Sequence, residues 1–272
     1  MRLIQVGSFN YEMASVSNNG IIVYSSNKID NKNLLFYKKL NSETSPVMIG
    51  EGSLPKISPQ GDKIIYSKGD SSIFVYEIKN NTTIDLTSKI QMSGTQSPAW
   101  DADGKNILFS AGKFPDIGLY RYNMETERIA TLLDVSGLNY GVSASPDGSK
   151  IAFRSARGKT KEEMKKGIVV YDLNTKTEKF ITTIGEYCTW SPDSKQLAFH
   201  WPDSSDFCIY TVNADGSDLR KIAKVKDSDC ELPSWSTDGN KLYFQTNRRN
   251  GNWEIWIMNK EGTDQQPLVW HD

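Results

Sequence analysis

Four aspartates recur at one position of a short turn and are the first candidates for chemistry in this chain. Asp103, Asp147, Asp193 and Asp238 are separated by 44, 46 and 45 residues. An exposed carboxylate in a turn can serve as a general acid or base or bind a metal. Acids at equivalent places of a repeated unit do not converge on one substrate, however, and Asp-Gly is a pair that tight hairpins prefer. The stretch 101–104 also lacks the later ligands of a calcium loop, so we expect turn residues.

Other reactive side chains are few. The two histidines, His200 and His271, exclude a three-histidine zinc centre. Cys188, Cys208 and Cys230 form no C-x-x-C pair, and we expect buried thiols. No G-x-S-x-G or G-x-x-x-x-G-K motif occurs. We therefore expect no catalytic residues, no metal, no cofactor and no enzyme activity. Whether an ion occupies the centre of the fold stays open.

The composition is that of an ordinary globular protein. The 272 residues are 38% hydrophobic and 24% charged, and the formal net charge is −1. Such a balance gives no overall field for nucleic acid or an anionic membrane. The first residues lack a signal-peptide pattern and no apolar run is long enough to span a bilayer. We expect a soluble monomer that is cytoplasmic as written, or periplasmic or extracellular if a leader was removed.

The elements that position these residues repeat along the whole chain. The turn and the strand after it occur six times, with intervals of 41, 43, 44, 46 and 45 residues. The repeats begin at Ser17, Ser58, Asp101, Ser145, Ser191 and Ser236. Six units of this length leave no room for a second domain, so residues 1–272 are predicted to form a single domain.

Each unit is predicted to contain four antiparallel strands. An aromatic residue lies eight positions past most of the starting residues, as Tyr66 and Phe153 do, within short β-branched and aromatic runs bounded by turn residues. Only residues 159–167 have the composition of a helical turn. Four strands repeated every 40 to 45 residues favour the blades of a propeller. The prediction is an all-β, six-bladed β-propeller.

The centre and the seam of this ring can also be predicted. Two residues before each repeat start, small side chains are expected to face the central channel; Lys56 is the exception and is a candidate charge there. An open sheet edge would leave backbone groups unpaired. We expect residues 2–6 to close the last blade beside Trp256, with residues 265–270 alongside or outside.

The repeats resemble the TolB-like family of six-bladed propellers. The resemblance rests on the W-S-P-D-G turn, the strand after it and the I-Y-x-x-N/D strand, and is clearest over residues 235–263. It covers nearly the whole chain. It implies WD-like repeats and a role either as a protein-binding domain or as the substrate-gating domain of a peptidase.

Function is then expected in the loops that differ between units. Arg, Trp and Tyr often carry binding energy at interfaces. Residues 154–166 hold six basic and two acidic side chains, so this loop favours an acidic partner. The candidate binding residues are Arg154, Arg157, Trp201, Arg248, Arg249, Tyr140 and Lys56. We expect a non-catalytic module that binds a protein or peptide, identity unknown, through its loop face and channel mouth; the alternative is a carbohydrate-binding or glycan-processing propeller with a site in the funnel.

Overall fold

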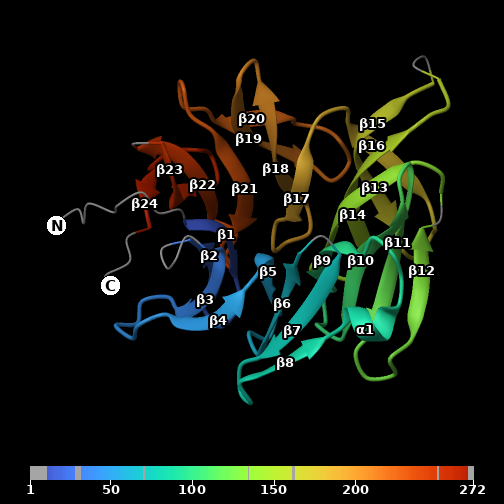
Figure 1. The fold of residues 1–272 in the computed structure, drawn as a ribbon. Helices are drawn as coiled ribbons and strands as arrows, with labels where there is room; N and C mark the ends of the chain where they lie inside the picture. Colours follow the sequence, from blue (N-terminus) through green and yellow to red (C-terminus); the bar gives the residue numbers. More distant parts are fainter. Residues whose placement is uncertain are drawn as a thin grey trace.

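The fold is an all-β propeller. The computed structural model describes residues 11–27, 32–69, 71–133, 135–160, 163–249 and 251–268. Its antiparallel sheets stand around a common centre (Figure 1), and the innermost strands β1, β5, β9, β13, β17 and β21 contact one another in a closed circle. Within the described ranges, no helix has the length and apolar character to cross a bilayer.

Four sheets contain four strands each, paired in chain order. The first comprises β1 (Tyr11–Val16), β2 (Ile21–Ser26), β3 (Leu34–Lys39) and β4 (Val47–Glu51). The second comprises β5 (Ser53–Ile57), β6 (Lys63–Lys68), β7 (Ser72–Glu77) and β8 (Thr82–Asp85). Two others comprise β17 (Glu186–Trp190), β18 (Gln196–Asp203), β19 (Asp206–Asn213) and β20 (Arg220–Ala223), and β21 (Cys230–Trp235), β22 (Lys241–Arg249), β23 (Asn252–Asn259) and β24 (Gln266–Pro267).

The remaining strands form one eight-stranded sheet, so the strand pairing gives four separate four-stranded blades instead of the six expected. Its strands are β9 (Gln96–Trp100), β10 (Asn106–Lys113), β11 (Asp116–Asn123), β12 (Ile129–Leu133), β13 (Leu138–Ala144), β14 (Lys150–Arg157), β15 (Lys165–Asp172) and β16 (Glu178–Thr182). The two halves are joined by one parallel bridge, between Ile117 of β11 and Leu138 of β13. The physical reason is that the loop after β12 brings the start of β13 against the edge of β11, where Asn139 Nδ2 donates to Ile117 O at 2.8 Å.

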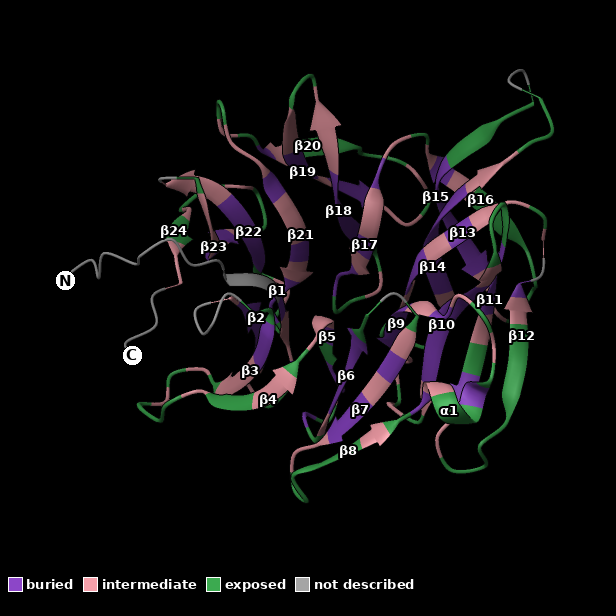
Figure 2. Cartoon of the chain, in the orientation of Figure 1, coloured by how far each residue is buried: buried purple, intermediate pink, exposed green. Residues whose placement is uncertain are grey.

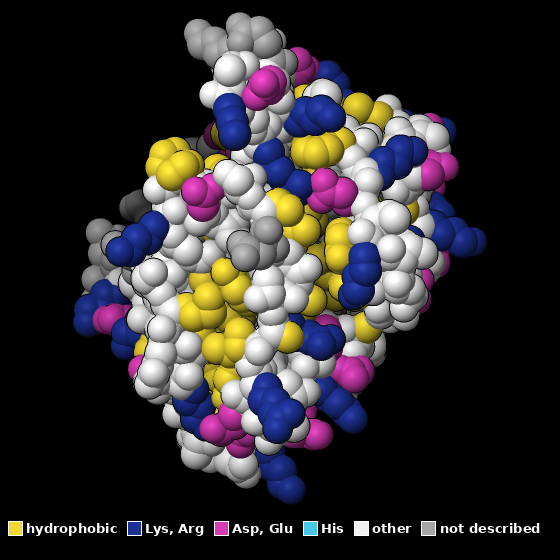
Figure 3. Space-filling model, turned by 90° about the vertical axis from the view of Figure 1, so that its right-hand side faces the viewer, with side chains coloured by type: hydrophobic (Ala, Val, Ile, Leu, Met, Phe, Trp, Pro, Cys, Tyr) yellow, Lys and Arg dark blue, Asp and Glu magenta, His cyan; other side chains and the backbone are white. Residues whose placement is uncertain are grey.

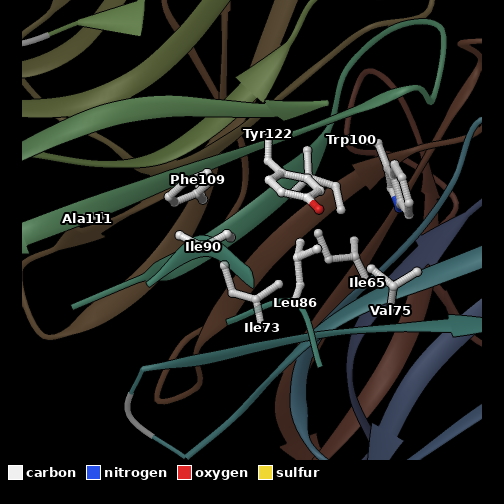
Figure 4. Packing of buried hydrophobic residues seen from close by; sticks show 10 residues of the cluster. Ile65, Ile73, Val75, Leu86, Ile90, Trp100, Phe109, Ala111 and Tyr122 are labelled. Carbon is white, nitrogen blue, oxygen red and sulfur yellow. The ribbon is translucent and has the colours of Figure 1, made fainter. Parts of the chain in front are cut away.

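Hydrophobic clusters fill the space between successive groups of strands. The second strand of each group is the most buried, as the purple stretches of β2, β6, β14, β18 and β22 in Figure 2 show. In Figure 4, Ile65, Ile73 and Val75 from β6 and β7 meet Trp100 and Phe109 from the next sheet. Burial on this scale contributes about 25 cal/mol per Å² of apolar surface. Packing between sheets therefore sets the geometry of the central strands.

A short helix, α1 (Thr87–Ile90), follows β8, outside residues 159–167, where the sequence predicted the only helical turn. The Asp85 carboxylate accepts hydrogen bonds from the backbone N–H groups of Thr87 and Ser88, at 3.0 and 3.3 Å, which caps the start of the turn. Leu86 and Ile90 are buried beneath it. The strand ends at Asp85 because this turn buries two apolar side chains.

The last sheet is completed by the C-terminal segment. Pro267 and Gln266 of β24 pair with Trp256 and Ile257 of β23. The prediction that residues 2–6 occupy this edge beside Trp256 is wrong at that position, because β24 fills it; residues 2–6 themselves lie outside the described residues. The seam is covered by a cluster in which Ile255 packs near Ala14, Ile22 and Tyr24.

Candidate functional site: a central channel and its mouth

A β-bulge interrupts every innermost strand at the same height. The pairing register with the second strand shifts between Ser53 and Lys56 in β5, for example, and between Glu186 and Thr189 in β17. Residues inside these bulges adopt the left-handed conformation, with φ of 51° at Leu54, 46° at Tyr187 and 48° at Leu232. Bulges re-aim side chains and often lie near functional sites. Here they direct a ring of side chains to one end of a channel.

The channel runs along the innermost strands and has a volume of about 410 Å³. Its walls extend from the bulge residues Leu54, Tyr187 and Leu232 to the turn prolines Pro59 and Pro146. Six residues line the middle of the channel. Each lies two positions before the start of its repeat and directly after the bulge of its strand. These are Ser15, Lys56, Ala99, Ser143, Thr189 and Ser234. The prediction that small side chains line the axis at this height is confirmed.

Lys56 is the exception that the sequence marked. Its backbone lies on β5, and its side chain lines the channel while remaining exposed. Desolvation by these walls lowers the pKa of Lys56. Burial raises the pKa of the neighbouring Cys188 thiol to about 12, with the Lys56 charge acting in the opposite direction. Cys188 is therefore a neutral thiol and does not neutralise Lys56.

A second cavity, of about 420 Å³, forms the mouth at the bulge end. It shares Leu54, Tyr187 and Leu232 with the channel, so the two are continuous. His200 and Trp253 line its other side. Burial raises the pKa of Tyr187, and Ser97 of β9 hydrogen-bonds it with the opposite effect, so its side chain reaches across the channel end.

Aromatic rings surround Tyr187 at the mouth. Tyr140 meets it edge-on with ring centroids 5.9 Å apart, and His200 stacks on it at 6.0 Å. Burial lowers the pKa of His200 to about 4, so the imidazole is neutral, and its Nδ1 accepts a hydrogen bond from Leu232 N at 3.3 Å. Burial and the Glu186 carboxylate raise the pKa of Tyr140 to about 12, which keeps it a neutral phenol. The mouth therefore presents neutral aromatic faces.

Arg154 supports this aromatic group from below. It pairs with Tyr140 across β13 and β14, and its guanidinium carbon lies 5.1 Å from the ring centroid of Trp201. Only 6% of its surface is exposed, and its Nη1 atom is buried with no hydrogen-bond acceptor among the described residues. Three predicted binding residues, Arg154, Trp201 and Tyr140, are thus brought together.

The other predicted arginines have structural contacts. Arg157 bonds to Glu178 through Nη1 at 2.8 Å and to Ser155 through Nε at 2.6 Å. Arg249 forms a two-bond ion pair with Glu254, both at 2.9 Å. Arg248 lies 4.2 Å from the Trp256 ring centroid and donates to Gln265 at 2.7 Å. All three guanidinium groups have partners in their own sheets, although Nη2 of Arg157 is buried without one, and none of them lines the mouth cavity.

The repeated acids behave as turn residues. Asp147 Oδ1 accepts hydrogen bonds from Ser145 Oγ at 2.6 Å and Ser149 N at 2.9 Å, which lower its pKa against the effect of partial burial. The hydroxyls of Ser191 and Ser236 donate to Asp193 and Asp238 in the same way, each at 2.6 Å. The carboxylates hold the hairpins closed, as the sequence predicted.

The charges on the face shown in Figure 3 are dispersed. Figure 3 shows Lys and Arg side chains scattered over the face that carries α1 and β12, with a band of hydrophobic side chains between them. In the described part of the chain, no group of three or more His, Cys, Asp or Glu side chains is arranged to hold a metal ion.

Sequence reasoning missed Tyr187 and Leu54, whose positive φ comes from the bulge. One signal was present: a proline follows the bulge residue in three strands, as Pro55, Pro98 and Pro233. Proline has no N–H to donate to a neighbouring strand and is found at bulges and edges. A proline three residues before the repeat start is thus a marker for a channel-lining bulge.

Comparisons with known proteins agree with this fold. No protein-family model matches the chain. Over 86 residues it is 30% identical to the Tol-Pal system protein TolB of Francisella tularensis, a stretch that is 32% of this chain and 19% of that protein. The chain thus spans about a fifth of the length of the curated relatives that it matches.

Solved structures cover more of the chain. TolB from Acinetobacter baumannii superposes with a TM-score of 0.70 at 21% identity, over 88% of this chain and 61% of that one. The propeller domain of the Trilobed protease from Pyrococcus furiosus gives 0.66 at 12% identity, over 98% and 99%. An oligogalacturonate lyase in complex with manganese gives 0.62 at 13%, over 97% and 79%. The chain has a TolB-like propeller fold, and at these identities the likeness establishes the fold alone.

Proposed function

We propose that this chain is a binding module that receives a protein or peptide segment at the channel mouth. The observation that carries the proposal is the continuity of the channel with a mouth cavity walled by Tyr187, His200 and Trp253. Concave sites with aromatic walls and a few polar groups are the usual form of ligand sites. A peptide strand entering here would bury its side chains against these rings.

We further propose that the ring counts as six blades in a single domain, residues 1–272. The eight-stranded sheet divides naturally at its one parallel bridge, Ile117 to Leu138. A separate hydrophobic cluster fills the gap there, with Leu108 and Leu119 of one half packed near Ile151 and Phe153 of the other. That arrangement matches the packing between the other sheets.

Affinity in this proposal comes from Tyr187 and Trp253, which line the mouth. Tyrosine and tryptophan contribute much of the binding energy at interfaces because they bury large area at small entropic cost. Both side chains keep part of their surface exposed, whereas Arg154, which contacts the Trp201 ring, is buried. Arg154 therefore acts by holding the Trp201 ring in place.

The second candidate function is a glycan-binding or glycan-processing funnel. It is favoured by the same aromatic faces, since sugar rings also stack on aromatic side chains, and by two acids near the mouth, Glu186 and Glu231. Hydrolysis of a glycoside needs two carboxyl groups on either side of one bond. Binding of a glycan without hydrolysis needs only the aromatic walls of the mouth.

A selection experiment tests the proposal. A random peptide library displayed on phage is selected against the intact chain, and the affinities of the selected peptides are measured for wild type and a Tyr187→Ala, Trp253→Ala double variant. We expect at least tenfold weaker binding by the double variant, about 1.4 kcal/mol. Phe114→Ala is the matched control, because Phe114 is an aromatic with 80% exposure on the hairpin between β10 and β11, outside the mouth.

The outcomes are distinct. Equal affinity of wild type and the double variant contradicts the mouth as the binding site, as does an equal loss in the Phe114 control. An oligosaccharide array run in parallel addresses the second candidate. Binding of a glycan that depends on Tyr187 and Trp253, with no selected peptide, overturns the peptide proposal in favour of the glycan funnel.

A further inference from the structure

Lys56 is an ammonium group without a protein counter-charge. No hydrogen bond or ion pair joins its Nζ atom to any residue in the described ranges, although its backbone is well held in β5. The other titratable side chains lining the channel are Asp101, Tyr187 and Cys188. Asp101 already accepts hydrogen bonds from Asn106 N and Nδ2, and the other two are neutral. An ammonium group that lines a channel without a protein partner can form charge-assisted hydrogen bonds with an anionic ligand.

Neutral donors stand at the same height as Lys56. Ser143, Thr189 and Ser234 occupy the equivalent register positions in their strands, paired with Ala152, Ala198 and Tyr243. Their hydroxyls line the channel, and none is hydrogen-bonded to another group in the part of the chain that the structure describes. A hydroxyl donates one hydrogen bond. One cation and four hydroxyls therefore surround the channel at a single level, the fourth being that of Ser15, which accepts a hydrogen bond from Ile57 N at 3.4 Å.

Three of the six backbone carbonyls at this level accept a hydrogen bond from an indole group. The indole N–H of Trp100 donates to Lys56 O at 3.0 Å, that of Trp190 to Ser143 O at 3.1 Å, and that of Trp235 to Thr189 O at 3.3 Å. Hard cations such as Ca²⁺ require several free carbonyl or carboxylate oxygens. The level offers donors in place of such oxygens, so it is suited to an anion.

The charge and the walls select the kind of anion. A single ammonium group balances one negative charge, and no guanidinium fork or run of backbone N–H groups is present among the lining residues to bind a phosphate dianion. The walls above and below are apolar, with Pro55, Leu232 and Trp235. We propose that the channel is a receptor for a carboxylate group, bound by Lys56 as counter-charge and by the hydroxyls of Ser143, Thr189 and Ser234.

A carboxylate can arrive free or at the end of a peptide. The second route rests on the proposed function, since the C-terminal end of a peptide held at the mouth would enter the channel toward Lys56. The probes are therefore acetate, the tripeptide Ala-Ala-Ala with a free C-terminus, and the same tripeptide with a C-terminal amide. Tryptophan fluorescence reports occupancy because Trp100, Trp190 and Trp235 line the channel, and titration calorimetry gives the affinity.

The variants isolate the charge. Lys56→Met keeps the length of the side chain and removes the ammonium, and Lys79→Met is the control at an exposed lysine of the same sheet. Thr189→Val removes one hydroxyl at nearly constant shape. We expect wild type and Lys79→Met to bind acetate and the free tripeptide but not the amide. Lys56→Met should lose at least tenfold in affinity for both carboxylates and Thr189→Val a few-fold, with unfolding temperatures recorded to show that each variant is folded.

Each result decides the matter. Equal binding by Lys56→Met and wild type, or no binding of either carboxylate by wild type, overturns the carboxylate receptor. Lys56-dependent binding of acetate without binding of the tripeptide supports the receptor and contradicts the peptide function. Binding of the amide as tightly as the free tripeptide, unaffected by Lys56→Met, leaves the peptide function standing and overturns the receptor.

Discussion

The indole N–H of Trp190 donates a hydrogen bond to the backbone carbonyl of Ser143, 3.1 Å away on the neighbouring innermost strand. In the same way, Trp100 donates to the carbonyl of Lys56 and Trp235 to the carbonyl of Thr189, each on the preceding innermost strand. Each indole thus ties one central strand to the one before it. The channel wall is a set of strands joined by side chains, because no backbone ladder connects them there.

Replacing Trp190 with Phe should destabilise the protein. The substitution keeps most of the buried ring, which is 4% exposed, but leaves Ser143 O without its donor. We expect a loss of about 1 kcal/mol for the hydrogen bond, against about 3–5 kcal/mol for Trp190→Ala, which also opens a cavity. Urea unfolding at pH 7 measures both. Equal stability of Trp190→Phe and wild type would show that the inter-strand bond contributes nothing.

His200 should make the protein sensitive to mild acid. Burial depresses its folded pKa to about 4 from 6.5, so its contribution to stability is fully present above pH 6.5 and is lost as the pH falls through about 4. The loss should reach about 2–3 kcal/mol. Stability curves from pH 7 to pH 4 should be flatter for His200→Gln than for wild type, and an imidazole signal titrating near 4 should vanish in the variant. A signal titrating near 6.5 that vanishes instead would contradict the burial of this ring.

Asp238 should stabilise its turn at neutral pH but not in acid. Hydrogen bonds from Ser236 and Asn240 lower its pKa to about 2, so its contribution is complete above about pH 4 and is lost as the pH falls toward 2. The side chain is largely exposed, so we expect a cost of about 1 kcal/mol for Asp238→Ala at pH 7 and a smaller difference at pH 2. Glu125→Ala, an exposed acid in another turn, is the control. A difference in stability between Asp238→Ala and wild type that stays constant with pH would refute the lowered pKa of Asp238.

Gly61 should tolerate a side chain less well than Gly20. Both glycines have a positive φ, 73° at Gly61 and 78° at Gly20, so alanine destabilises the fold at either position. A Cβ on Gly61 would also lie 2.2 Å from Asn19 Oδ1, while one on Gly20 meets no heavy atom within 4 Å. Asn19 would have to move and give up its bonds to Ser17 and to Gln60 O. We expect Gly61→Ala to be about 1 kcal/mol less stable than Gly20→Ala, measured by thermal unfolding, and equal values would show that the turns do not support one another.

The sequence predicted the propeller and its turns because both depend on local chemistry. A hairpin such as that at Asp147 needs the same residue types in every unit, so the repeat is visible without coordinates. The fusion of two groups at Ile117 and Leu138 was not visible, because one backbone bridge leaves no pattern in the side chains. The predicted contribution of Arg248 to a binding face also depended on an unseen neighbour, since Trp256 lies under its guanidinium.

The same limit applies to the candidate site. Lys56 stood out because a charge interrupted a row of small residues at a fixed place in the repeat. Tyr187 did not, since its direction follows from a bulge that neighbouring strands impose. The repeat thus predicts where a channel residue lies along the axis. It does not predict the position of the Tyr187 ring, because that depends on contacts between strands in the folded protein.

The contacts between turns make the blades non-interchangeable. Asn19 Nδ2 donates to Gln60 O at 3.1 Å and Gln60 Nε2 to Asp103 O at 2.8 Å, while Asp147 N donates to Ser194 Oγ at 3.0 Å. Moving the unit that carries Asp147 into the place of the one that carries Gln60 would set a carboxylate against a carbonyl, two acceptors with no proton between them. The turn face therefore encodes the order of the repeats, so that a chain built from identical copies could close a ring but would have no defined starting blade.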